Sequence, residues 1–401
     1  MSDARKVALA RSSACLAVLV LILAACGSGT SAGPSATSRT SDACSSLSRG
    51  KAAETLLPGL FAVSAAAGTD QAWALGQHRA NAGCGFTYYL VHFSGLAWTE
   101  VAAFPPEDRL SGVSAISGRK AWIWGSYQRG TDWNAPPILD VVSGNTVRQA
   151  NPPMLSHVYG WGFAASGPEN ALFAGGARSR RGRFLGVRVA GWDGGSWHSL
   201  PTPPSVSGPL SLSTSGSSDS WMATMTAGKS RVFHWDGTSW SASYAPPAAL
   251  YRPNSAPARM SVASTPGRAW VVYNQESTVD PENGPGPPPR PFSAYFDGLR
   301  WRAVAVPSSF STLSAVTLAG GDAWAFGQLK TNFPAIAYSH LGTAWRLQRL
   351  PPPQYKGCNP AEPGISAASP TYVVAVGCLA FVNNGRLWQR VDPRPSRWSG
   401  S

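Results

Sequence analysis

Residues 313–345 decide the fold of this chain. They contain the segment Leu313-Ser314-Ala315-Val316-Thr317-Leu318, the segment Asp322-Ala323-Trp324-Ala325-Phe326-Gly327, and the ending His340-Leu341-Gly342-Thr343-Ala344-Trp345. Alternation of apolar residues with small or polar ones is typical of a β-strand. Short strands of this kind, separated by residues that favour turns, predict an antiparallel sheet.

Two markers from this stretch recur along the chain about every 49 residues. The first marker is a small residue followed by Trp, and the second is Gly-x-x-Trp. The first ends at Trp73, Trp122, Trp221, Trp270 and Trp324, with weaker copies at Leu172 and Val373. The second ends at Trp98, Trp197, Trp240, Trp301, Trp345 and Trp388, with a weaker copy at Val147. Each marker therefore occurs seven times, and the markers hold eleven of the 17 Trp residues.

Each repeat is predicted to form four strands. In the second repeat the expected strands are residues 110–116, 121–124, 138–142 and 146–150. Pairs such as Asp236-Gly237 and Asp297-Gly298 are typical of tight hairpin turns. Four antiparallel strands repeated radially predict an all-β fold, a seven-bladed β-propeller, with the marker Trp side chains packed between blades. A solenoid would need terminal capping repeats, and none of the seven repeats resembles a cap.

The composition agrees with a loop-rich β-protein. The 401 residues include 42 Gly and 34 Pro, and prolines at this frequency exclude a mainly helical fold. Charged residues make up 13% and hydrophobic residues 43%, so there is ample apolar surface for a folded core. A single long apolar run, near the start of the chain, excludes a polytopic membrane protein.

The N-terminal sequence predicts export and lipidation. Arg5, Lys6 and Arg11 precede an apolar run at 14–25, which is typical of a signal peptide. The run ends Leu23-Ala24-Ala25-Cys26, which resembles a bacterial lipobox and implies a lipid on Cys26; a plain secretory signal is the alternative. We expect a signal peptide at 1–25, a lipidated Cys and flexible linker at 26–43, the propeller at 44–393 and a tail at 394–401. The expected location is the outer face of the cytoplasmic membrane.

Four cysteines remain after Cys26, and export into an oxidising compartment favours two disulfides. These are Cys44, Cys84, Cys358 and Cys378, which lie only in the first and last repeats. Local pairing predicts Cys44–Cys84 and Cys358–Cys378; a bond that crosses the seam of the ring, Cys44–Cys358 or Cys44–Cys378, is the alternative. No His lies at ligand spacing from these cysteines, so we expect no metal site and no cofactor.

The repeats resemble those of exported actinobacterial propeller proteins. The segment His234-Trp235-Asp236-Gly237-Thr238-Ser239-Trp240 fits that pattern best, and the likeness covers about residues 60–393. It suggests the kelch-like propeller group, although the Gly-Gly doublet of true kelch repeats, present at Gly175-Gly176, does not recur in phase. A resemblance of this kind implies fold and leaves activity open.

Variable loops between the second and third strands are expected to share one face and to carry function. Candidate ligand-binding side chains on these loops are Tyr127, Trp133, Arg178, Arg180, Arg181 and Arg183. The arginines could contact lipid phosphates or an anionic wall polymer, or they could simply be solvated. The Pro-rich segment 285–291 is either a docking segment or a stiff loop.

The sequence offers no catalytic constellation, and we predict no catalytic residue. A hydrolase needs two carboxylates that converge on one bond, whereas the acids of the expected loop face are few and scattered. The net charge is +13, but nucleic acid is not expected outside the membrane. The predicted function is an extracytoplasmic, membrane-anchored binding module, monomeric, whose partner is an envelope protein or an anionic wall polymer. The alternatives are a glycan-active propeller enzyme and a structural envelope component.

Overall fold

The structure is a computed structural model of the chain. The residues that it describes are 59–79, 86–105, 108–127, 137–150, 153–179, 181–226, 229–246, 260–274, 279–280, 284–285, 291–348, 350–351, 364–377 and 379–391. The chain divides into two compact units, 1–46 and 47–401, and every described residue belongs to the second. In these ranges no helix has the length and apolar character needed to cross a bilayer.

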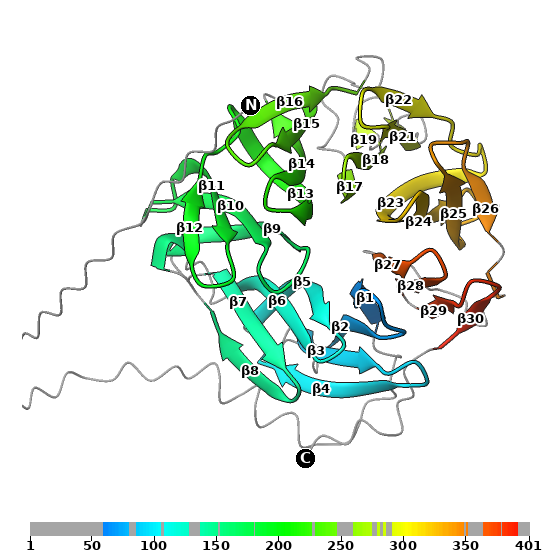
Figure 1. Cartoon of the computed structure of the whole chain (residues 1–401), viewed down its shortest axis with the longest axis horizontal. Helices are drawn as coiled ribbons and strands as arrows, with labels where there is room; N and C mark the ends of the chain where they lie inside the picture. The colour runs from blue at the N-terminus through cyan, green and yellow to red at the C-terminus, as the bar shows by residue number, and fades with distance from the viewer. Residues whose placement is uncertain are drawn as a thin grey trace, which may run out of the picture. The chain divides into compact units, whose positions relative to one another are not determined.

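The second unit is built of seven four-stranded antiparallel sheets, each formed by one continuous segment (Figure 1). Blade 1 holds β1 (Gly59–Ala65), β2 (Ala72–Arg79), β3 (Phe86–Phe93) and β4 (Trp98–Phe104). Blade 2 holds β5 (Asp108–Ser117), β6 (Lys120–Tyr127), β7 (Pro137–Ser143) and β8 (Thr146–Gln149). After a 3-10 turn η1 (Pro153–Leu155), blade 3 holds β9 (Val158–Ala165), β10 (Ala171–Arg178), β11 (Phe184–Trp192) and β12 (Trp197–Leu200). Blade 4 holds β13 (Val206–Gly216), β14 (Asp219–Thr226), β15 (Lys229–Trp235) and β16 (Trp240–Tyr244).

The remaining three blades follow the same order. Blade 5 holds β17 (Met260–Thr265), β18 (Arg268–Asn274), β21 (Pro291–Phe296) and β22 (Trp301–Val304), with a small hairpin of β19 (Val279–Asp280) and β20 (Gly284–Pro285) between its second and third strands. Blade 6 holds β23 (Phe310–Ala319), β24 (Asp322–Leu329), β25 (Pro334–His340) and β26 (Arg346–Gln348). Blade 7 holds β27 (Gly364–Ser369), β28 (Tyr372–Val376), β29 (Ala380–Asn383) and β30 (Trp388–Arg390). The predicted seven-bladed propeller of four-stranded blades is confirmed.

The first and last blades meet side by side, and no strand is exchanged between them (Figure 1). Strand β1 packs against β27 and β28, and one apolar cluster joins Leu60, Ala74 and Val91 of blade 1 to Val374 and Val382 of blade 7. The ring is therefore closed by apolar packing between whole blades. The four cysteines of the predicted disulfides lie outside the described residues, so their pairing stays a prediction.

Hydroxyl side chains link neighbouring inner strands. Each first strand is the edge of its sheet, so half of its backbone N–H groups have no partner strand. Several of these N–H groups donate to a hydroxyl of the preceding blade: Ala115 to Ser64 (2.9 Å), Val262 to Ser211 (3.1 Å), Val316 to Ser261 (3.2 Å), Ala367 to Thr317 (3.1 Å) and Ala65 to Ser366 (2.9 Å). The Ser and Thr side chains of the inner strands thus provide hydrogen-bond acceptors for backbone N–H groups at the inner edges of the sheets.

The two Trp markers meet between adjacent blades. Each marker Trp of the second strands is at most 4% exposed. It packs against the Gly-x-x-Trp indole of the next blade in three places, with ring centroids 5.7 Å apart for Trp122–Trp197, 5.6 Å for Trp221–Trp301 and 4.6 Å for Trp270–Trp345. The core role predicted for these side chains is confirmed, and the regular period reflects their repeated contact.

The Asp-Gly turns between the third and fourth strands differ from the tight hairpin that the sequence suggested. Four residues separate the paired Trp235 and Trp240. In this turn Asp236 Oδ1 accepts the N–H groups of Thr238 and Ser239, both at 2.8 Å, and only Gly237 has a positive φ, +97°. Because the carboxylate binds two backbone N–H groups of the turn, this four-residue loop needs only one residue with a positive φ, the glycine.

Asp219 joins two blades as well as ending a turn. Its Oδ1 accepts from Trp221 Nε1 at 2.9 Å and lies 2.9 Å from His234 Nε2, while Oδ2 accepts from Ser215 Oγ (2.7 Å) and from the Gly267 N–H of blade 5 (3.0 Å). Burial alone raises the pKa of this carboxyl, but these hydrogen bonds outweigh burial and lower the pKa below its ordinary value. The His residue that recurs in phase with the repeat is therefore held in a structural pair.

Candidate functional site

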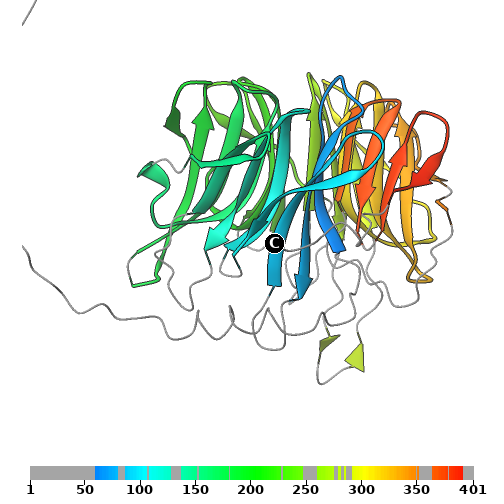
Figure 2. The ribbon, with the colours of Figure 1, turned by 90° about the horizontal axis from the view of Figure 1, so that it is seen from below.

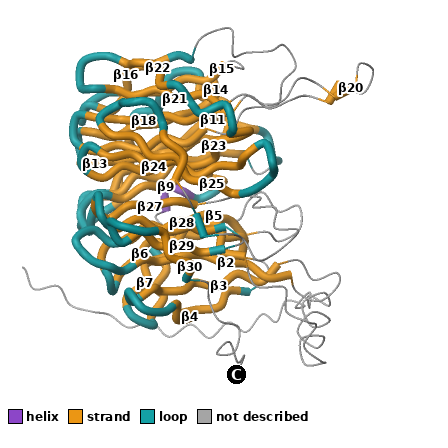
Figure 3. Tube along the Cα trace, turned by 90° about the vertical axis from the view of Figure 1, so that its right-hand side faces the viewer, coloured by secondary structure: helices purple, strands orange, loops and turns teal. Residues whose placement is uncertain are grey.

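One end face of the ring carries the connections between second and third strands and the links from blade to blade, as the order of the strands requires. The β19–β20 hairpin of blade 5 lies on this face, away from the sheets (Figures 2 and 3). This is the face on which the sequence predicted the variable loops. We call it the loop face.

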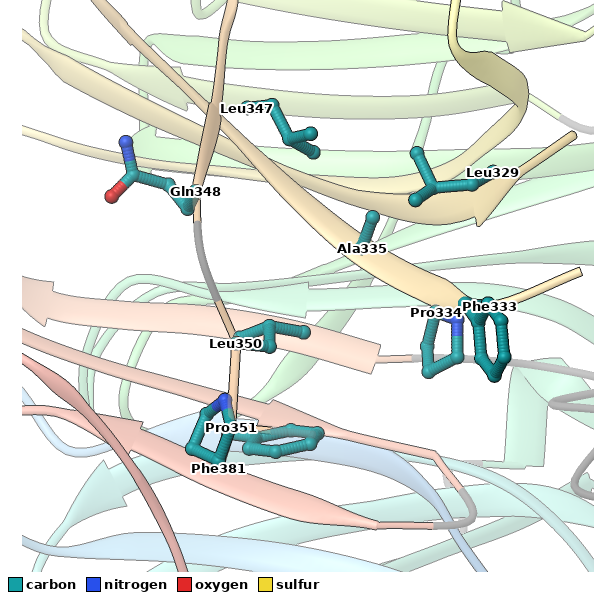
Figure 4. Close-up of a pocket in the computed structure, with 9 residues that line it drawn as sticks. All are labelled: Leu329, Phe333, Pro334, Ala335, Leu347, Gln348, Leu350, Pro351 and Phe381. Atoms are coloured by element: carbon teal, nitrogen blue, oxygen red, sulfur yellow. The ribbon is translucent and has the colours of Figure 1, made fainter. Parts of the chain in front are cut away.

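An apolar pocket opens between blades 6 and 7 at the loop face (Figure 4). Its lining comes from the end of β24 and the turn after it, from β25 and β26, from the link that follows, and from β29 of the next blade. The lining residues are Leu329, Phe333, Pro334, Ala335, Leu347, Gln348, Leu350, Pro351 and Phe381. Ala335 and Phe381 form its floor, at 3% and 1% exposure, and Phe333 and Leu347 stand at its rim, at 52% and 46% exposure.

The size and chemistry of the pocket limit what it can hold. It encloses about 200 Å³, below the roughly 300–1,000 Å³ of pockets that take whole small-molecule ligands. A cavity of about 150 Å³ is enough for a benzene ring. Gln348 is the one lining residue with a polar side chain, and the lining holds no acid, base or nucleophile. The pocket therefore suits a single aliphatic or aromatic group.

Carboxylates are scarce along the inner strands that surround the ring axis. In the described inner strands, charged side chains occur only at the start of β5, at Asp108 and Arg109. Asp108 raises the pKa of one acidic neighbour, Asp140 of β7, but Asp140 is 6% exposed and sits among apolar side chains between blades 1 and 2. A carboxyl so deeply buried does not reach a glycan, so this pair lacks the geometry of two acids that flank one bond.

Asp140 is expected to make stability depend on pH. Burial, and to a smaller extent the charge of Asp108, raises the pKa of its carboxyl to about 6. The folded state then holds more protons than the unfolded state between about pH 4 and pH 6, so stability increases as the pH falls through this window. We expect the free energy of unfolding of Asp140→Asn, relative to the unaltered chain, to fall by about 1.4 kcal/mol between pH 7.5 and pH 5. Denaturant titrations at several pH values measure this difference.

Asp193→Asn is the matched control for this effect. The Ser196 and Gly195 N–H groups donate to the Asp193 carboxylate and lower its pKa, so its contribution is lost, not gained, as the pH falls. Asp193→Asn should therefore shift the pH profile in the opposite direction. A profile of Asp140→Asn that runs parallel to that of the unaltered chain would show that Asp140 is ionised normally.

The predicted ligand-binding residues fall into two groups. Trp133 and Arg180 lie outside the described residues, and for Tyr127 only the backbone, at the end of β6, is described. Arg178 is at the end of β10, where its guanidinium donates to the Gly182 carbonyl (3.0 Å) and so fixes its own loop. Arg181 and Arg183 are exposed on that loop. The loop and the apolar pocket are on different blades, so the structure does not combine them into one site.

The sequence did not indicate the pocket. Phe333 belongs to one of the loops between second and third strands, which the sequence analysis expected on this face, but Leu347, Leu350 and Phe381 carried no signal beyond their place in strands or links. The Asp140 carboxyl was also missed, although an acid inside the apolar run Ile138-Leu139-Asp140-Val141-Val142 was visible in the sequence. In the described part of the chain, no three His, Cys, Asp or Glu side chains gather closely enough to hold a metal ion.

No protein-family model matches the sequence, and no curated protein matches it significantly. Among solved structures, the chain is similar to the BP39L lectin from Burkholderia pseudomallei, with 13% identity over 84% of this chain and 99% of that chain, TM-score 0.53. It is also similar to the GH74 xyloglucanase from Xanthomonas campestris, with 15% identity over 84% of this chain and 55% of that chain, TM-score 0.54. The six-bladed fungal lectin of Aleuria aurantia matches with 13% identity over 75% and 97% of the two chains, TM-score 0.46.

These likenesses show the propeller fold. The chain spans about half the length of the xyloglucanase. The two structures with TM-scores above 0.5 are a lectin and a xyloglucanase, so the shared fold by itself does not distinguish binding from catalysis.

Proposed function

We propose that this chain is an extracytoplasmic binding module, anchored to the membrane through Cys26, that holds an extended segment of a protein partner and takes up one of its apolar side chains. The observation that carries the proposal is the pocket between blades 6 and 7, whose lining is apolar and sized for one side chain. A sugar-binding or glycan-cleaving site would need several polar or acidic groups directed at the ligand. The described lining has only Gln348 in that role.

The strand beside the pocket favours a segment of protein as the occupant. Leu347 and Gln348 belong to β26, which is the outermost strand of blade 6 and pairs on one side with β25. No described strand covers its other edge. An extended peptide that adds to such an edge gains backbone hydrogen bonds, while a neighbouring pocket selects one of its side chains.

Charging the rim of the pocket should abolish this binding. Leu347 is 46% exposed, so Leu347→Asp leaves the core intact but places an ionised group against an apolar ligand. We expect peptides selected from a displayed random library on the unaltered chain to share one large apolar residue. Their affinity for Leu347→Asp should be at least about tenfold lower, the equivalent of about 1.4 kcal/mol. Titration calorimetry or fluorescence anisotropy with those peptides measures the loss.

Leu387→Asp is the control, because Leu387 is 69% exposed in the turn between β29 and β30, at the end of blade 7 away from the loop face. It should bind the selected peptides normally. A glycan array run in parallel tests the alternative function, a propeller that binds or cleaves sugars. Strong glycan binding that is indifferent to Leu347→Asp, or cleavage of a glycan, would overturn the proposal in favour of a sugar-directed propeller.

A further inference from the structure

We infer that the loop between β10 and β11 of blade 3 docks on an anionic lipid bilayer. The surface concerned, which we call the blade 3 tip, consists of Arg181, Arg183, Phe184 and Leu185. It is separate from the pocket between blades 6 and 7, and the inference does not depend on that pocket.

Hydrogen bonds connect the described residues at the base of the blade 3 tip. Within the loop the Ser179 N–H donates to the Arg183 carbonyl and the Gly182 N–H donates to the Ser179 carbonyl, both at 2.8 Å. The Arg183 N–H donates to Ser179 Oγ at 3.1 Å, and the Arg178 guanidinium closes the loop on the Gly182 carbonyl. These bonds tie together the described residues at the base of the loop, so less conformational entropy is lost there when the tip binds a surface.

A β-bulge turns an apolar side chain outward at this tip. Arg178 pairs with Phe184 and Ala177 pairs with Gly186, so Leu185 is the extra residue of β11 and has no partner in β10. Leu185 is 60% exposed and Phe184 is 39% exposed. Phe184 is supported from one side by Trp161 of β9, with ring centroids 5.8 Å apart and planes at 29°. Bulges redirect side chains in this way, and here the bulge presents two large apolar groups to solvent.

The charged side chains of this hairpin are all positive. The hairpin of β10 and β11 contains five arginines and no acidic residue. Arg181 and Arg183 are exposed, and neither forms an ion pair with a carboxylate that the structure describes. The two guanidiniums are therefore available to a partner that carries negative charge.

A bilayer fits both properties of the tip. Guanidinium groups near an anionic membrane surface each contribute about 1 kcal/mol, and adjacent apolar side chains gain free energy by entering the boundary between headgroups and acyl chains. A soluble polyanion would use the arginines but would leave Leu185 in water. The exposed leucine therefore favours lipid over a free polymer.

Hydrogen exchange of the full chain on vesicles tests this inference directly at the tip, whatever the N-terminus contributes to binding. On vesicles with about a third phosphatidylglycerol, compared with phosphatidylcholine alone, amide exchange in residues 179–188 should slow at least about threefold. Raising the salt to about 1 M, where the Debye length is about 3 Å, should reverse the effect. Arg181→Ser with Arg183→Ser should weaken the anionic-lipid-dependent protection about 30-fold in apparent affinity, and Leu185→Ser about tenfold.

Leu299→Ser with Arg300→Ser is the matched control. This pair lies in the turn between β21 and β22, at the opposite end of its blade, and Leu299 is 92% exposed. The control should leave the protection of residues 179–188 unchanged. Equal exchange on both kinds of vesicle, or an effect of the control as large as that of the tip variants, would overturn the inference. So would equal protection by soluble polyphosphate that persists in Leu185→Ser, because that result identifies a polyanion site.

Discussion

Trp270→Ala is expected to lower the free energy of unfolding by about 3–5 kcal/mol. Trp270 is fully buried between blades 5 and 6. Its ring lies 4.6 Å from that of Trp345 and 5.1 Å from that of Tyr295, so the truncation removes contacts on both sides of the blade interface. The cavity would be bounded by two sheets that are tied into a ring and cannot close on it. The midpoint of thermal unfolding, followed by circular dichroism, should fall by about 4–7 °C, because the entropy of unfolding of a unit this large is about 0.7 kcal/mol/K.

Phenylalanine at two Trp positions separates packing from hydrogen bonding. The indole N–H of Trp270 has no acceptor in the structure, whereas Trp221 Nε1 donates to Asp219 at 2.9 Å. Trp270→Phe therefore removes ring area alone, and Trp221→Phe also removes a hydrogen bond to a carboxylate. We expect Trp221→Phe to cost about 1–2 kcal/mol more than Trp270→Phe. Equal losses would show that the Asp219 contact adds nothing to stability.

Gly327→Ala is expected to destabilise the chain by about 3 kcal/mol or more, although it adds one methyl group. A Cβ at this position would lie 2.0 Å from the backbone oxygen of Thr312. The inner strand β23 is bulged between Leu313 and Ala315, which brings its backbone against Gly327 of β24. A backbone oxygen in a paired strand cannot rotate away as a side chain can. Thermal or denaturant unfolding of the purified variant measures the loss.

The same close approach recurs in other blades. A Cβ on Gly125 would lie 2.2 Å from the Arg109 oxygen, and one on Gly175 would lie 2.3 Å from the Tyr159 oxygen. These glycines stand three residues after the first marker, so their recurrence in the repeat has a steric cause. Gly216→Ala is the control, because no atom lies within 4 Å of its Cβ position and its φ is not positive. It should be neutral or slightly stabilising. A comparable loss in Gly216→Ala would refute the steric explanation.

Much of the fold could be predicted because its determinants are local in sequence. Trp73 and Trp122 mark second strands 49 residues apart, and this interval holds one complete blade. The strands of the second repeat were predicted at 110–116 and 121–124, and the structure extends them to Asp108–Ser117 and Lys120–Tyr127. The third turn was predicted less well, because the pattern Asp-Gly does not reveal that the carboxylate caps a loop of four residues.

The candidate site was harder to predict because it combines residues that come together only in the folded chain. Arg181 and Arg183 were identified from their charge, but nothing in the sequence showed that a bulge exposes Leu185 beside them. The pocket combines Leu347 of blade 6 with Phe381 of blade 7, and the two lie in separate repeats. Their juxtaposition depends on how far one sheet is inclined to the next.

The sequence by itself determined the number of blades, their four-stranded order and the role of the marker Trp side chains. These features depend on the alternation of apolar and polar residues, on turn residues and on the repeat period. All three can be read from one segment of sequence without knowing what that segment packs against. The tertiary structure alone decided that Asp140 is buried with a raised pKa, that blades 6 and 7 leave an apolar pocket, and that whole blades close the ring. Burial and enclosure arise only when two sheets pack together, and the same side chain would be solvated on a single isolated blade.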